Sequence, residues 1–209
     1  MHALIINFNR ITLPAMTAQW CHNQGLYPVI VDNASDYPPL LDYYQTRCPY
    51  PVARMEKNYG HMVVWEQDLI SRLGVSLPFI VTDPDLDYSG VPGDWLKVFE
   101  QGLRKYPVFK KIGFSLETSD VKHQCTVDWE QKFWSLPLDN LYYNAPIDTT
   151  FAMYNTTEFT FDAIRTGRPY TARHLPWYYD KAEDLPPDEQ HYYKTQAEEY
   201  AAHTQVKKD

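Results

Sequence analysis

Short apolar runs separated by amphipathic stretches fill the first part of the chain. Four of these runs predict buried β-strands, at residues 3–8, 27–31, 52–55 and 77–82. The stretches between them predict three helices, over residues 12–25, 38–47 and 61–73. Prolines near the first two helix starts and glycines at two helix ends, Gly25 and Gly74, support these boundaries. Repeated strand–helix alternation predicts an α/β fold with a mainly parallel sheet and helices on both faces.

The pattern becomes less regular after residue 90. Asp94 is placed to cap a helix that runs through Lys105, and strands are predicted over residues 111–116 and 150–154. Residues 120–155 are rich in aromatic side chains, which is consistent with a mixed sheet edge and an aromatic second lobe. We expect one domain over residues 1–185, followed by a polar segment, 186–209, that forms a weakly packed helix or a linker to further domains.

Composition narrows the class of protein. With 209 residues, of which 44% are hydrophobic, the chain is long enough for one domain with a substantial core. A net charge of −8 argues against a nucleic-acid partner. Cys21, Cys48 and Cys125 are far apart in sequence, so we expect neither a disulfide framework nor a zinc site. Because no apolar run is long enough to span a membrane, we expect a soluble, cytoplasmic protein in a reducing compartment.

Two carboxylates follow the predicted strand at 77–82. Asp83 and Asp85 flank Pro84 at the point where that strand ends. Open α/β sheets bind ligands at the carboxyl ends of their strands, and carboxylate oxygens are the ligands that Mg²⁺ and Mn²⁺ prefer. The same three residues are also common in turns, so this motif alone leaves a structural role open.

Polar residues follow the other predicted strands as well. They are Asn9 and Arg10, Asp32 and Asn33, and the segment 58–60. Each cluster has an ordinary explanation as a turn or a helix cap. Four such clusters after four successive strands should nevertheless converge on one edge of the sheet, where a nucleotide binds in folds of this kind.

These segments resemble a known family. Residues 5–10, 29–35, 58–60 and 82–85 are similar to the nucleotide-sugar half of GT-A glycosyltransferases that carry a D-x-D motif, a family-2-like pattern. The similarity covers about the first 90 residues, and the small glycosyltransferase domain encoded by chlorella viruses is the nearest likeness. The resemblance implies a GT-A (Rossmann-like) domain with a donor-binding half, 1–90, and an acceptor-side half, 91–185. It also implies a virus-encoded protein of the host cytosol.

The resemblance also implies a donor and a metal. The donor is a UDP-sugar, with Asp32 near the uracil, and with Asn9 and Arg10 lining the base pocket. Asp83 reaches the ribose or the metal, and Asp85 binds Mn²⁺ or Mg²⁺. Such a cation neutralises the charge that develops on the leaving diphosphate. The full set of donor-binding residues implied in this half is Asn9, Arg10, Asp32, Asn33, Asn58, Gly60 and Asp83.

The second half supplies further candidates. His174 resembles the late histidine that gives many GT-A enzymes a third metal ligand, and Arg173 beside it is suited to a phosphate oxygen. Asp148 and Glu117 are the candidate catalytic carboxylates, although Asp148 also fits a turn before a strand. Because the family's usual base position has no clear match, the sequence favours a retaining reaction.

Three functions remain open at this point. The preferred one is transfer of a hexose or deoxyhexose from a UDP-sugar to a hydroxyl of a glycan or glycoprotein acceptor. A sugar nucleotidyltransferase is the second, but it calls for a glycine-rich phosphate loop that residues 9–13 do not provide. The third is a non-catalytic module that binds a sugar nucleotide or a glycan.

Overall fold

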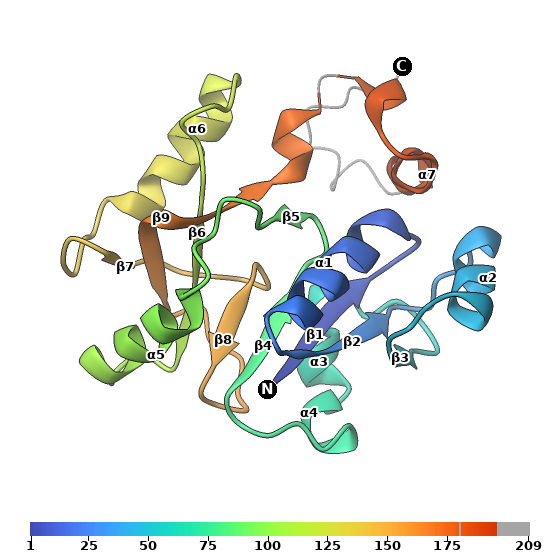
Figure 1. The fold of residues 1–209 in the computed structure, drawn as a ribbon, viewed down its shortest axis with the longest axis horizontal. Coiled ribbons are helices and arrows are strands. Elements are labelled where there is room, and N and C mark those ends of the chain that lie inside the picture. Colours follow the sequence, from blue (N-terminus) through green and yellow to red (C-terminus); the bar gives the residue numbers. More distant parts are fainter. Residues whose placement is uncertain (180, 196–209) are drawn as a thin grey trace.

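A mixed sheet of nine strands organises the computed structural model, which describes residues 1–179 and 181–195. The strand order is β3-β2-β1-β4-β8-β6-β9-β5, and β7 pairs with β9. In Figure 1 the parallel part lies on the right with α1 and α2, and the later strands lie on the left with α5 and α6. The predicted fold class is confirmed: the chain forms an α/β domain with helices on both faces of the sheet.

The first half follows the predicted alternation closely. Its elements are β1 (His2–Asn7), α1 (Thr12–Asn23), β2 (Tyr27–Asp32), α2 (Pro38–Thr46), β3 (Val52–Arg54) and β4 (Phe79–Thr82). These four strands pair in parallel, in the order β3-β2-β1-β4. The chain therefore moves away from β1 in one direction through β2 and β3, and then returns to its other side with β4. This reversal puts the ends of β1 and β4 beside each other.

The helix predicted over residues 61–73 is interrupted. The structure has three short pieces instead, η1 (Gly60–Met62), α3 (Val63–Glu66) and α4 (Leu69–Arg72). Asp68 has a left-handed backbone with φ 47°, which ends α3 and turns the chain before α4. Both helical pieces bury apolar residues in the same cluster, Val63 and Val64 from α3 and Leu69 and Ile70 from α4.

The second half is mixed, as predicted, but two of its largest elements were not foreseen. Its elements are β5 (Leu86–Asp87), α5 (Trp95–Lys105), β6 (Lys111–Leu116), α6 (Gln124–Gln131), η2 (Lys132–Trp134), β7 (Tyr142–Asn144), β8 (Ala152–Tyr154), β9 (Ile164–His174), η3 (Leu175–Tyr178), η4 (Ala182–Asp184) and α7 (Pro187–Thr195). The helix α6 and the long strand β9 are the unforeseen ones. β8 runs antiparallel between β4 and β6 and joins the two halves into one sheet.

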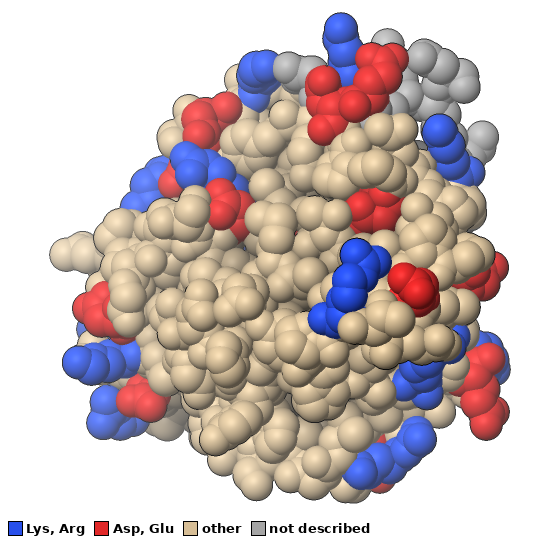
Figure 2. Space-filling view, turned by 45° about the vertical axis from the view of Figure 1, so that its right-hand side comes forward, with Lys and Arg blue, Asp and Glu red and all other residues tan. Residues whose placement is uncertain are grey.

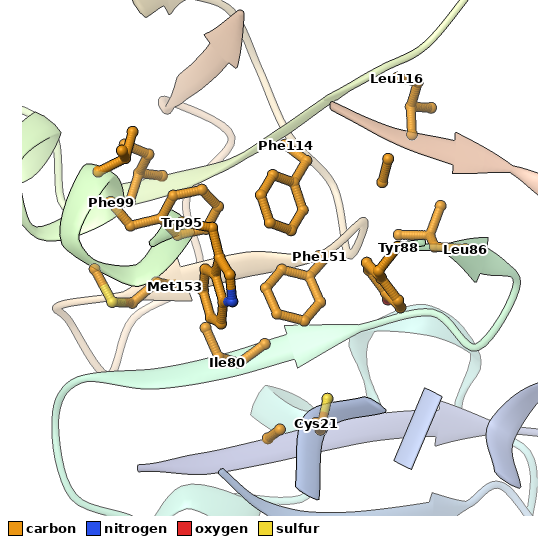
Figure 3. Close-up of a cluster of buried hydrophobic side chains, with 14 of the residues drawn as sticks. Cys21, Ile80, Leu86, Tyr88, Trp95, Phe99, Phe114, Leu116, Phe151 and Met153 are labelled. Atoms are coloured by element: carbon orange, nitrogen blue, oxygen red, sulfur yellow. The ribbon is translucent and has the colours of Figure 1, made fainter. Parts of the chain in front are cut away.

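Two apolar clusters cover the two faces of the sheet. Neighbouring residues of one strand belong to different clusters, as with Phe79 and Ile80, because successive side chains of a strand point to opposite faces. Figure 3 shows the larger cluster, in which aromatic rings from α5, β6 and the residues around β8 meet. Phe151 lies at its centre, with ring centroids 5.1 Å from Phe114 and 5.4 Å from Trp95. This cluster fixes the segment that precedes β8.

The helix α7 differs from the weakly packed helix or linker that its polar sequence suggests. Asp188 and Glu189 are buried, with 4% and 0% of their surfaces exposed, against the start of α1 and the end of β1. The polar residues Asp188 and Glu189, which suggested solvent exposure, attach α7 to the rest of the domain. Residues 196–209 of the predicted tail lie outside the described residues.

Surface charge is dispersed on the face drawn in Figure 2. Lysine and arginine alternate with aspartate and glutamate around a largely uncharged centre, and the described residues of this face form no continuous basic patch. Among the described residues, no helix has both the length and the apolar character that crossing a membrane demands.

Phe151→Ala tests the central place of this ring in the core. Phe151 is fully buried, so removing the ring should lower the free energy of unfolding by about 3–5 kcal/mol. Phe161→Ala is the matched control, because that ring is 55% exposed and its loss should cost about 1 kcal/mol or less. Urea denaturation with a common m-value measures both. Equal losses in the two variants would contradict the packing described here.

Candidate functional site

A cleft of about 490 Å³ opens at the carboxyl ends of β1 and β4. Four of the predicted polar clusters contribute to its wall, which is the convergence that the sheet topology requires. Its polar lining residues are Asn7, Arg10, Asn33, Asn58, His61, Asp83, Asp85, Asp148, Thr149, His174, Tyr192 and Tyr193, and Gly60 lies beside them. Of these, Asp148, Thr149 and His174 come from the second half, and the two tyrosines come from α7.

Asp83 is held at the cleft by its contacts with Thr149. The Thr149 hydroxyl lies 3.0 Å from both of its oxygens, and its backbone N–H donates to the Thr149 carbonyl at 3.1 Å. Burial raises the pKa of Asp83 well above its ordinary value, and the nearby charges of Asp148 and Asp85 raise it further. Three carboxyl groups therefore repel one another across this part of the cleft.

Asp85 is held in its charged form by two basic side chains. Arg10 Nη1 lies 3.0 Å from Asp85 Oδ2, and His174 Nε2 lies 3.7 Å from Asp85 Oδ1. Burial raises the pKa of Asp85, but Arg10 and His174 outweigh that effect, and the net pKa lies below the ordinary value. The structure thus brings together the three residues that the resemblance implied as metal ligands, with Arg10 added to them.

Arg10 connects the cleft to α7. Its guanidinium also contacts Glu189 Oε2, from Nε at 2.9 Å and from Nη2 at 2.8 Å, and it lies 4.1 Å from the centre of the Tyr192 ring. Glu189 Oε1 is buried and has no hydrogen-bond partner among residues 1–179 and 181–195. Because one guanidinium serves both Asp85 and Glu189, only one of the two carboxylates can be fully neutralised by it.

Asp188 fixes the other side of α7 by capping α1. Its Oδ2 accepts hydrogen bonds from the backbone N–H groups of Ile11, at 2.6 Å, and Thr12, at 2.7 Å, and its Oδ1 accepts one from the Thr12 hydroxyl at 2.8 Å. A carboxylate at a helix N-terminus satisfies free N–H groups and suits the helix dipole. The cap of α1 therefore comes from a residue far along the chain.

Two predicted donor-binding residues lie behind the cleft wall. Asp32 is fully buried and accepts from Arg54 Nε at 3.0 Å and from the Tyr44 hydroxyl at 3.2 Å. Asn9 has a left-handed backbone with φ 55°, and its side chain bonds the residues that follow β2. Neither side chain lines the cleft, so the structure gives both a role in shaping the loops around it.

Asn33 and its partners form one rim of the cleft. The Asn33 amide donates to the Gly60 carbonyl at 2.8 Å, and its oxygen accepts from the Tyr59 N–H at 3.1 Å. Gly60 has φ 68°, a conformation that glycine adopts without strain. These bonds place the segment 58–60 against the end of β2, where Asn58 also lines the cleft.

Asp148 lines the cleft and also forms a turn. Its Oδ1 accepts from the Thr150 N–H at 2.9 Å and the Thr150 hydroxyl at 2.8 Å. Burial raises the pKa of Asp148, but these hydrogen bonds and the charge of Arg165 outweigh it and leave the net pKa below the ordinary value. The sequence suggested either a carboxylate of the site or a turn residue, and Asp148 has features of both: it lines the cleft and it forms a turn.

Glu117 and Arg173 do not line the cleft. Both line a separate groove of about 270 Å³, where Arg168 Nη2 contacts Glu117 Oε1 at 2.6 Å. Arg173 contacts Asp120 there at 2.7 Å. Arg173 and His174 are neighbours on β9, so their side chains leave opposite faces of the strand. Only His174 can face the cleft, and the sequence did not show which one does.

Several cleft residues were not among the sequence candidates. They are Asn7, His61, Thr149, Tyr192 and Tyr193, together with Glu189 behind them. Pro187 followed by two acidic residues is a recognisable helix start, so α7 itself had a local signal. Its position against β1 depends on contacts between distant residues, for which the sequence pattern has no signal.

The carboxylates suit a divalent cation by their chemistry, although they do not form a ready-made cage. Among the described residues, no group of three or more His, Cys, Asp or Glu side chains is arranged to hold a metal ion. Three carboxyl groups nevertheless interact with the guanidinium of Arg10, those of Asp83, Asp85 and Glu189, and Asp148 lies near Asp83. Mg²⁺ and Mn²⁺ sites often use one or two carboxylates and are completed by substrate phosphates. The residues present fit a site of that kind.

The fold and the cleft define an α/β domain with an acidic cleft at the topological switch of its sheet. No protein-family model and no curated protein matches this chain. Two solved structures are similar to it. S. aureus TarS, residues 1–349, has 9% identity and a TM-score of 0.46 over 84% of this chain and 60% of its own. HddC from Yersinia pseudotuberculosis has 12% identity and a TM-score of 0.48 over 77% of this chain and 83% of its own.

This chain therefore spans 60% of the TarS chain. At sequence identities of 9% and 12% and TM-scores of 0.46 and 0.48, the two similarities do not indicate a function. The functional inference rests on the cleft itself.

Glu189→Gln tests whether burial raises the pKa of the Glu189 carboxyl group. Burial raises the pKa of Glu189 from 4.5 to about 7, so the folded state binds its proton more tightly than the unfolded state does. The resulting stabilisation is complete below about pH 4.5 and is lost as the pH rises through about 7. The variant cannot ionise at this position. The free energy of unfolding of the wild type minus that of the variant should therefore fall across this window, by on the order of 3 kcal/mol.

Chemical denaturation at a series of pH values measures this difference. Glu183→Gln is the matched control, because Glu183 is an exposed acid that precedes α7. Its pH dependence should follow that of the wild type. A constant difference between the wild type and Glu189→Gln from pH 4 to 8 would show that burial does not raise the pKa of Glu189.

Proposed function

We propose that this protein is a metal-dependent glycosyltransferase that uses a UDP-sugar. The observation that carries this proposal is the meeting of Asp83, Asp85, Asp148 and His174 in one cleft at the switch point between β1 and β4. Open α/β sheets bind nucleotides at that point. The two carboxylates of the D-x-D motif lie where a diphosphate would follow a nucleoside bound on the β1–β2 side.

The charge of the cleft supports the metal. A nucleoside diphosphate is an anion, and the cleft presents several carboxyl groups with Arg10 already engaged by two of them. Without an added cation, the donor and the carboxylates would repel each other. Asp85, Asp83 and His174 would hold Mn²⁺ or Mg²⁺, which would remove this repulsion and supply charge stabilisation for the leaving UDP. The protein's own residues orient the donor and exclude water.

The acceptor side favours a retaining reaction. An inverting enzyme needs a carboxylate that is free to take the proton of the acceptor hydroxyl. Asp148 is the carboxylate on this side, and its Oδ1 is already engaged by Thr150. Its lowered pKa makes it a weak base. We therefore assign Asp148 to orienting a hydroxyl of the transferred hexose or deoxyhexose, with a glycan or glycoprotein as acceptor.

The start of α1 gives less support to nucleotidyl transfer. That reaction would use free backbone N–H groups at this helix N-terminus to hold phosphates. Ile11 and Thr12 donate those groups to Asp188 instead. The proposed function therefore places the diphosphate at the D-x-D motif and not at the start of α1.

Calorimetric titration of UDP, with and without Mn²⁺, tests the proposal. The wild type should bind UDP at least about 10-fold more tightly with Mn²⁺, and Asp85→Asn should lose this enhancement, a difference of about 1.4 kcal/mol or more. Asp87→Asn is the matched control, because Asp87 lies two residues further on and lines the separate groove. It should bind UDP as the wild type does.

Turnover is then measured as release of UDP from UDP-glucose and UDP-galactose. Binding that is independent of both Mn²⁺ and Asp85 would overturn the metal assignment. Metal-dependent binding of UDP without release of UDP from any donor would favour a non-catalytic binding module.

A further inference from the structure

Lys111 is a buried lysine that the proposed chemistry does not use. It begins β6, has 0% of its surface exposed and is among the largest fully buried side chains. Its Nζ donates to three backbone carbonyls, those of Ile147 at 2.6 Å, Asp148 at 2.7 Å and Thr160 at 3.0 Å. These three acceptors use all three protons of an ammonium group.

The surroundings of this ammonium are costly for a charge. The ring centres of Tyr154 and Phe159 lie 4.7 and 4.9 Å from Nζ, and their attraction for a cation offsets part of the cost of burial. Burial lowers the pKa of Lys111 to about 7, although the charges of Asp148 and Asp83 act in the opposite direction. An apolar side chain of similar length would avoid this desolvation. Since packing alone does not need a lysine here, the three carbonyls that it binds indicate its role.

Two of those carbonyls, those of Ile147 and Asp148, belong to the segment that forms one wall of the cleft. The Ile147 and Asp148 carbonyls bind Lys111, while the Asp148 and Thr149 side chains line the cleft. The Tyr154 hydroxyl also donates to the Asp148 carbonyl, at 3.1 Å. Thr149 then makes the hydrogen bonds to Asp83 described above. An unbroken series of contacts thus runs from the ammonium through the loop to the first carboxylate of the D-x-D motif.

We propose that Lys111 is a positioning residue of the cleft, whose ammonium holds residues 147–149 so that Asp148 and Thr149 face Asp83. The reaction that the loop serves is taken from the proposed function. The positioning of residues 147–149 by Lys111 does not depend on it. Lys111 touches neither donor nor acceptor, and it acts through the backbone that carries Asp148 and Thr149. Its loss should therefore affect turnover more than UDP binding, because the β1–β2 rim of the cleft does not depend on it.

Lys111→Met tests this role, with Lys110→Met as the matched control. Lys110 is the preceding residue, is exposed, and donates only to the Pro107 carbonyl. Lys111→Met should lower kcat for UDP release by about 100-fold, the loss expected from a misplacement of about 1 Å. Its affinity for UDP without Mn²⁺ should stay within about 3-fold of the wild-type value. Lys110→Met should match the wild type in both.

Chemical rescue separates positioning from a general effect on folding. In Lys111→Ala, added n-propylammonium should restore kcat at least about 10-fold, while n-propanol, which carries no charge, should not. The measurement also serves if Lys111→Met does not fold. Folded Lys111→Met with wild-type kcat, or equal restoration by the alcohol, would overturn the proposal. So would failure of both variants to fold with or without the amine.

Amide hydrogen exchange tests the loop independently of any reaction. The Asp83 N–H, which donates to the Thr149 carbonyl, should exchange at least about 10-fold faster in Lys111→Met, whereas the Ile30 N–H, which donates to Pro51, should not change. Unchanged exchange at Asp83 would overturn the positioning role. A wild type that shows no turnover would overturn the proposed function alone, because the exchange result would still decide the role of Lys111.

Discussion

The buried guanidinium of Arg10 joins parts of the structure that are far apart in sequence. It follows β1, contacts Asp85 after β4, and binds Glu189 on α7, with only 4% of its own surface exposed. Buried ion pairs of this kind add little stability, because both charges must be desolvated, but removing one partner is costly. Arg10 therefore fixes where these three segments meet. The position of the cleft depends on that meeting point.

The charges around Arg10 are unbalanced, and this imbalance connects structure with chemistry. Asp85 is kept ionised by Arg10, while burial favours the protonated forms of Glu189 and Asp83. A site with this excess of carboxyl groups is suited to a cation, and through the cation to an anionic ligand. Lys111 lies on the far side of the same loop and is fully engaged by carbonyls, so it does not compete for that role. Lys111 thus supports the cleft wall from behind, whereas the carboxyl groups line the cleft itself.

Local patterns in the sequence predicted the parallel half of the fold and the edge at which the site lies. Apolar runs of strand length and glycine stops are local signals, and they located β1, α1, β2 and α2 well. The cleft residues Asp83 and Asp85 followed from strand ends that must converge. Glu117 and Arg173 lie in a separate groove, and for Arg173 the sequence could not show this because the face of a strand residue depends on register, which pairing with distant strands decides. The polarity of Asp32 and Asn9 suggested that both contact a nucleotide. It could not show the loop conformation, including the left-handed backbone of Asn9, that puts their side chains behind the cleft wall. The polar sequence of α7 indicated solvent exposure, whereas its acidic residues bind Arg10 and the start of α1.

The Asp188 cap on α1 has a consequence for the order in which the molecule is completed. Synthesis proceeds from the N-terminus, so β1, α1 and β2 are made long before Asp188 and Glu189. During that interval, the start of α1 lacks its carboxylate cap, and Arg10 has Asp85 as its only acidic partner among these residues. The sheet can pair its parallel strands early, but the ligand cleft reaches its final form only when α7 leaves the ribosome.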